Sequence, residues 1–213
     1  MTAVTQQDVQ AFCDCCVAMR SLWEHRSALF EGPASRRDLL RQVAPGFFRD
    51  LDHLLIEHLI LQICKITDPE ESSRGEQNLT LEFLVNHADF TEAPETIVTL
   101  RQLRAQMQAF REKIVPARNK LIGHLDRTSV LRPGTVGQGM GGAGMGGAAL
   151  GGASGADWRH FWLNLQDFLH ILHKRFIDPA GGFHLNDIAG PSDAEGLVTA
   201  LRESRQGPAG SVS

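Results

Sequence analysis

Residues 94–126 read PETIVTLRQLRAQMQAFREKIVPARNKLIGHLD. Apolar side chains recur through the first part of this stretch at three- and four-residue intervals, which places them on one face of an α-helix. They are Ile97, Leu100, Leu103, Met107, Phe110 and Ile114. Pro94 suits the first turn of that helix, where an N–H would be unpaired anyway. Pro116 is expected to kink the helix or to begin a new segment, because proline removes a donor and clashes with the preceding turn.

The same periodicity recurs along the chain, whereas convincing strand alternation does not. Further helices are therefore expected from a Thr5–Asp8 capping box, from a second capping box at Ser35–Asp38, and over residues 45–66, 79–86 and 156–176. At 213 residues the chain is long enough for one well-buried domain. The predicted fold class is an all-α bundle of about five or six helices.

Half of residues 134–155 are glycine. Such a segment loses too much backbone entropy on ordering to hold a helix or strand, so we expect a flexible loop before the last long helix. The apolar stripe of that last helix must return to the same core. The loop is therefore predicted to be an insertion within one domain, residues 1–180. Residues 181–213 are expected to be a largely disordered tail with a further short helix at 192–204.

The segment Arg118–Asp126 makes the most specific chemical suggestion of the chain. Arginine carries a permanent planar charge that matches phosphate, and histidine titrates closest to neutral pH. Arg118 and His124, with Asn119 beside the arginine, are therefore a candidate pair for cleaving a phosphodiester. On a regular helix, residues six apart are separated by about 9 Å of rise and about 120° of rotation. A two-fold dimer, or a helix break at Gly123, would be needed to bring them together.

Two motifs resemble the HEPN superfamily, specifically its abortive-infection-protein-U-like branch. That branch shows Arg-Asn-Lys-x-x-Ala-His-x-Asp, and this chain reads RNKLIGHLD at 118–126, with Gly123 in the place of the usual alanine. Upstream, Lys65–Asp68 and Asn78–Leu84 resemble the end of a helix and the following leucine-rich segment of that branch.

The resemblance implies a HEPN-like helical domain with metal-independent endoribonuclease chemistry at a dimer interface, often in phage defence or toxin–antitoxin systems. His124 would be general base or acid for attack by the RNA 2′-hydroxyl, and Arg118 would stabilise charge on the phosphoryl oxygens. Asn119 would orient the phosphate or the histidine, and Lys120 would lower the pKa of His124. Asp126 would orient an Arg or Lys. No metal or other cofactor is expected.

The net charge of −4 argues against a globally basic nucleic-acid coat, although a local basic patch would suffice for RNA. Arg104, Arg111 and Arg118 are seven residues apart and form either a phosphate-binding row along one helix face or an ordinary solvated face. The first residues lack the pattern of a signal peptide, and no stretch is apolar enough for a membrane span. We therefore expect a cytoplasmic protein that does not associate with membranes.

Cys13 and Cys16 have the Cys-x-x-Cys separation of a zinc site, but no second Cys or His pair at zinc-finger spacing accompanies them. Cys13, Cys15, Cys16 and Cys64 are instead expected to be reduced, buried and structural.

Two alternatives to the ribonuclease stay open at this stage. One is a non-catalytic HEPN-type module that binds RNA, a nucleotide or a protein partner. The other is a structural helical dimer in which the motif forms interface ion pairs. The expected partners are a second copy of the chain, RNA, and an antitoxin or other protein.

Overall fold

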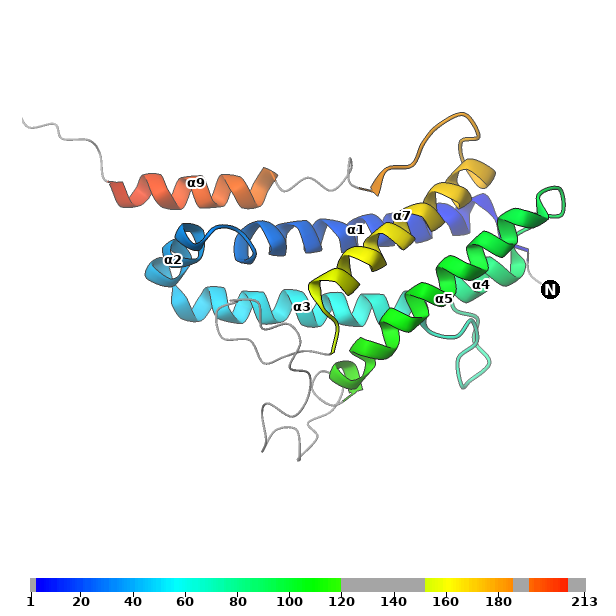
Figure 1. The fold of residues 1–213 in the computed structure, drawn as a ribbon, viewed down its shortest axis with the longest axis horizontal. Coiled ribbons are helices and arrows are strands. Elements are labelled where there is room, and N and C mark those ends of the chain that lie inside the picture. The colour runs from blue at the N-terminus through cyan, green and yellow to red at the C-terminus, as the bar shows by residue number, and fades with distance from the viewer. Residues whose placement is uncertain (1–2, 120–151, 186–191, 207–213) are drawn as a thin grey trace, which may run out of the picture.

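The computed structural model describes residues 3–119, 152–185 and 192–206. Within these ranges the chain forms seven α-helices and no strand apart from one isolated bridge (Figure 1). The all-α prediction is confirmed. The helices are α1 (Gln6–Phe30), α2 (Ala34–Val43), α3 (Pro45–Thr67), α4 (Leu81–His87), α5 (Pro94–Ala117), α7 (Gly155–Phe176) and α9 (Ser192–Gln206).

Two pairs of long helices form the main core. Helix α1 lies along α3, and α5 lies along α7, with the second pair crossing the first (Figure 1). The fully buried Trp158 of α7 joins three helices, because its ring stacks on Trp23 of α1 at 4.7 Å and meets the edge of Phe110 of α5 at 5.0 Å. This aromatic contact fixes α5, the helix that leads into the Arg-Asn motif, against the rest of the bundle.

The sequence predicts the starts of some helices correctly and of others incorrectly. The Thr5 capping box is present, and Pro45 and Pro94 begin α3 and α5 as expected. Helix α2, however, begins at Ala34 without any side-chain cap, so the predicted capping box at Ser35 is wrong. The predicted start of α4 at Leu79 is also wrong: the Thr80 hydroxyl accepts the Phe83 amide, and the helix begins at Leu81.

Helix α9 packs on the far end of the bundle, over α1 and α2 (Figure 1). Its Ala194 and Val198 are buried in a second, smaller apolar cluster, and the two Nη atoms of Arg36 each donate to one Glu195 carboxylate oxygen at 2.8 Å. The sequence predicts a short helix at 192–204 within a largely disordered tail. The structure describes this helix over Ser192–Gln206, with Ala194 and Val198 of its apolar face buried against the bundle.

Three of the four cysteines are buried as expected: Cys13, Cys16 and Cys64 are at most 1% exposed. The prediction is wrong for Cys15, which lies on the exposed side of α1. Adjacent helix positions point about 100° apart, so burying Cys16 turns Cys15 outward. Burial raises the pKa of the Cys13 thiol to about 12 and that of Cys16 well above its ordinary value.

This difference predicts the pattern of thiol labelling. In the native protein at mildly alkaline pH, we expect a thiol reagent to modify Cys15 alone, since thiolate character and access both govern reactivity. All four thiols should react after unfolding in urea. Titration with a chromogenic disulfide reagent measures both numbers, and the Cys15→Ser variant serves as the control. Rapid reaction of two or more thiols in the native protein would contradict the described packing.

Candidate functional site

The candidate site begins at the end of α5. The helix does not break at Pro116; it continues to Ala117, and residues 118–119 form a wider π-type turn. The Arg118 amide donates to the carbonyls of Ile114 and Val115, which closes the last turn although Pro116 has no N–H to offer. Arg118 has helical dihedral angles, φ −52° and ψ −49°. It therefore keeps the helical register that the preceding arginines set.

The three arginines do lie along one face of α5, but they do different things. Arg104 pairs with Glu82 of α4, and an Arg111 Nη lies 2.6 Å from an Asp68 carboxylate oxygen at the end of α3. Arg118 Nη1 donates to Asn119 Oδ1 at 3.3 Å, and within the described residues no carboxylate pairs with it. Arg104 and Arg111 are thus engaged in internal ion pairs, whereas Arg118 has no acidic partner among the described residues.

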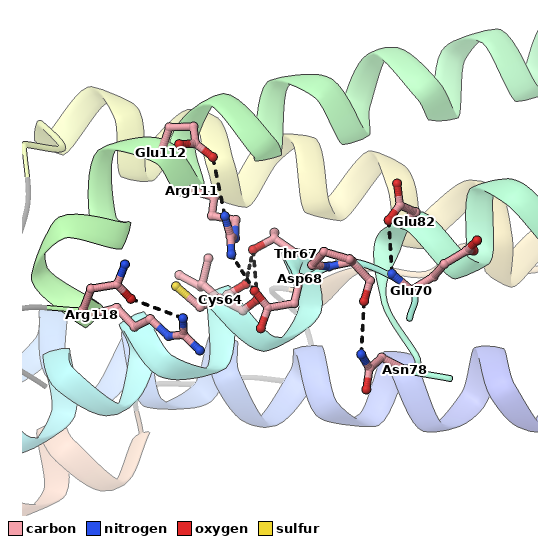
Figure 2. A network of polar contacts seen from close by, with 12 residues as sticks. Cys64, Thr67, Asp68, Glu70, Asn78, Glu82, Arg111, Glu112 and Arg118 are labelled. Carbon is pink, nitrogen blue, oxygen red and sulfur yellow. Dashed lines mark hydrogen bonds and ion pairs between the residues drawn. The ribbon is translucent and has the colours of Figure 1, made fainter. Parts of the chain in front are cut away.

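Arg118 lies against α3, next to Cys64 (Figure 2). The Cys64 side chain is buried, which raises its pKa, while the positive charges of Arg111 and Arg118 act in the opposite direction. Thr67 completes the end of α3, because its hydroxyl donates to the Ile63 carbonyl at 2.6 Å. Arg118, partly buried as a residue, thus lies beside the end of α3 and close enough to act on the Cys64 thiol.

The segment between α3 and α4 is tied to this site by a carboxylate. One Glu82 oxygen accepts the Glu70 backbone amide at 3.1 Å (Figure 2). The other Glu82 oxygen contacts Arg104. The Asn78 amide in turn donates to the Glu70 carbonyl at 2.7 Å. Ion pairs to α5 thus bring together Lys65–Asp68 and Asn78–Leu84, the two upstream motifs that the sequence singled out.

Some of these residues were missed by sequence reasoning. Asp68 and Glu82 stood within the quoted motifs, but nothing in the sequence indicated that each pairs with an arginine of α5. The seven-residue spacing of the arginines was the available signal. Of the predicted site residues, Arg118 and Asn119 are hydrogen-bonded to each other. Lys120, His124 and Asp126 lie outside the described residues, as does most of the glycine-rich range.

The last four residues of that range, 152–155, are described and differ from the expected loop. The Gly152 amide donates to the Lys113 carbonyl at 3.0 Å, Ala153 is fully buried, and Ser154 begins α7 with a capping box to Asp157. Lys113 Nζ also lies 2.6 Å from an Asp157 oxygen. The chain that leaves α5 after Asn119 therefore returns beside the last turns of the same helix.

Asp157 carries a pH-dependent part of the stability. Hydrogen bonds from Lys113 and Ser154 lower the pKa of its carboxyl from 3.8 to about 2. A folded pKa below the unfolded value stabilises the native state above the unfolded pKa, and this contribution is lost as the pH falls toward the folded pKa.

We expect Asp157→Asn to cost about 1 kcal/mol near neutral pH, the usual value of a helix cap. The difference in the free energy of unfolding between wild type and variant should narrow as the pH falls from about 6 to about 3. Urea unfolding at both pH values measures this difference. An equal gap at the two values would show that the charge of Asp157 does not contribute.

In the described part of the chain, no group of three or more His, Cys, Asp or Glu side chains is arranged to hold a metal ion. No helix among the described residues is long and apolar enough to cross a membrane.

The fold and this site define a class of protein. It is an all-α bundle in which an Arg-Asn pair ends the long helix α5, and ion pairs join α5 to α4 and to the end of α3. The family model of the HEPN domain AbiU2 matches residues 7–176, and the chain belongs to that family. Helix α9 lies beyond the matched range. No curated protein and no solved structure matches the chain.

Proposed function

We propose that this HEPN domain is a metal-independent endoribonuclease that acts as a dimer, in phage defence or as a toxin. The observation that carries the proposal is the state of Arg118. It ends a row of three arginines on α5, and it is the member that no described carboxylate neutralises. A guanidinium that lies beside α3, and that no carboxylate of the described residues pairs with, is suited to bind a phosphate.

The chemistry follows from the residue types. Arg118 donates to the non-bridging phosphoryl oxygens, whose negative charge grows in the transition state. His124 takes the proton of the RNA 2′-hydroxyl, whose oxygen attacks the adjacent phosphorus. The bond to the 5′-oxygen of the next nucleotide then breaks, and that oxygen receives a proton from a general acid. The products are a 2′,3′-cyclic phosphate and a 5′-hydroxyl. Asn119 holds the guanidinium, and Lys120 and Asp126 support the site electrostatically.

A dimer is proposed because Arg118 and His124 are six positions apart in the sequence. Arg118 and His124 of one chain point about 120° apart on a continuous helix, so a second copy supplies the missing partner. We expect Arg118→Ala and His124→Ala to be inactive alone and to regain cleavage when they are unfolded together and refolded as mixed dimers. Inactive mixed dimers, with wild type active after the same treatment, would contradict a shared site.

The alternative is a non-catalytic HEPN-type module that binds RNA, a nucleotide or a protein. The Arg118–Asn119 pair also suits this role, because binding a phosphate requires no proton transfer. Wild type that binds RNA in a salt-dependent manner without cleaving it would favour this alternative over the ribonuclease.

A further inference from the structure

Helices α5 and α7 leave a cleft of about 430 Å³ between them. It lies on the side of α5 turned away from the arginine row, because Lys113 follows Arg111 by two residues, a rotation of about 200°. A volume of this size falls within the range of roughly 300–1,000 Å³ typical of small-molecule sites. Its walls are Gln106, Ala109 and Lys113 of α5, and Asp157, His160 and Asn164 of α7.

The antiparallel register of the two helices gives this cleft a defined shape. The Lys113–Asp157 ion pair closes one end at 2.6 Å. Phe110 and Phe161 form the floor, with ring centroids 4.8 Å apart and side chains almost fully buried. Ala109, which lines the hollow, contributes only a methyl group to it.

The polar groups of the cleft indicate what it binds. The side chains of Gln106, His160 and Asn164 make no hydrogen bond to another described residue. Lys113 and Asp157 neutralise each other, so the described residues that line the hollow offer no unpaired carboxylate or lysine. A phosphate would find no free lysine or arginine among them. A flat, neutral group with several donors and acceptors would find two amides, an imidazole and an aromatic floor.

We propose that this cleft binds an unpaired nucleobase. Bases that are splayed out of a single strand are recognised by hydrogen bonds to their edges together with aromatic contact, and carboxamides match those edges because they donate and accept side by side. The inference rests on the proposed function in taking RNA as the source of the base. Lys113 precedes Arg118 by five residues, about 7.5 Å of rise and about 140° of rotation, so a single strand that reaches both the cleft and the phosphate contact passes around α5.

The test fills the hollow without removing a hydrogen-bonding group. Ala109→Leu places a larger side chain above the aromatic floor, and Ala105→Leu, at an exposed position of α5 outside the cleft, is the matched control. Asn164→Ala removes one amide. Fluorescence anisotropy in EDTA measures the binding of a labelled single-stranded RNA of about twelve nucleotides and of an abasic ribose-phosphate chain of equal length. Thermal unfolding checks that each variant folds.

We expect Ala109→Leu to weaken RNA binding about tenfold, Asn164→Ala to weaken it several-fold, and neither to change binding of the abasic chain. Ala105→Leu should leave both affinities unchanged. Wild type could also bind free nucleosides, and Ala109→Leu could abolish that binding without an effect on RNA binding. This result would support base recognition and would identify free nucleosides or nucleotides, not RNA, as the source of the base. Equal losses for RNA and the abasic chain would overturn the proposal. So would unchanged binding of both RNA and nucleosides in Ala109→Leu and Asn164→Ala.

Measuring RNA cleavage by the same variants shows whether the base-binding cleft or the proposed ribonuclease function is wrong. If wild type cleaves RNA, Ala109→Leu should raise KM and leave kcat close to wild type, because the base contact is remote from the reacting phosphate. Base-dependent binding without any cleavage would refute the ribonuclease and support the cleft. Cleavage with unchanged KM in Ala109→Leu and Asn164→Ala would support the ribonuclease and refute the cleft.

Discussion

Replacing Arg118 by alanine is expected to slow RNA cleavage about 10²- to 10³-fold, the usual cost of removing one donor that stabilises transition-state charge. Arg118→Lys should retain only part of the activity, because an ammonium keeps the charge but loses the planar, two-pronged hydrogen bonding of a guanidinium. The measurement is a single-turnover rate in EDTA with a labelled RNA, which reports the chemical step apart from product release.

The matched control is Arg104→Ala on the same face of α5. Arg104 is already paired with Glu82, so its loss should change the cleavage rate little and cost at most about 1 kcal/mol of stability, the usual limit for a partly exposed ion pair. If Arg104→Ala and Arg118→Ala lose activity equally, the arginines act as one basic surface, and the special role given to Arg118 is wrong.

The largest stability effect is expected at Trp158. Trp158→Ala should lower the free energy of unfolding by about 3–5 kcal/mol, since the ring is fully buried and joins α1, α5 and α7. For a chain of this length that corresponds to a fall in Tm of roughly 6–20 °C.

Leu163→Ala provides the comparison for Trp158→Ala, because it removes a large apolar side chain from the same helix at a position that is 60% exposed. Its free energy of unfolding should stay within about 0.5 kcal/mol of wild type. Urea unfolding of the two variants measures the difference. Similar stabilities for both would mean that the three-helix aromatic contact does not hold the bundle together.

Local chemistry explains which parts of the fold the sequence predicts. The Thr5 capping box and the prolines at 45 and 94 act within one turn of their own position, so the starts of α1, α3 and α5 follow directly. Ser154 and Asp157 form a similar capping box, but the surrounding glycines mask it in the composition. Helix α9 depends on an apolar surface built by distant helices, which periodicity alone does not reveal.

In the candidate site too, features set by neighbouring residues are predictable from the sequence, and features set by distant parts of the fold are not. The sequence identifies Arg118 and Asn119, and the structure joins them by a hydrogen bond. The sequence alone could not distinguish Arg118 from Arg104 and Arg111. The carboxylates that neutralise those two arginines, Glu82 and Asp68, belong to other parts of the fold. The cleft between α5 and α7 also escapes sequence analysis, since its walls come from two helices whose register only the folded chain defines.

The most direct test of a metal-independent ribonuclease is the chemical nature of the ends that wild type produces. An RNA with one strongly cleaved position is incubated in EDTA beside the same RNA carrying a single 2′-deoxynucleotide on the 5′ side of that bond. We predict 2′,3′-cyclic phosphate and 5′-hydroxyl ends from the first RNA and no cleavage at the substituted position of the second. Cleavage at the deoxy position, or activity that appears only with added metal ions, would contradict attack by the 2′-hydroxyl.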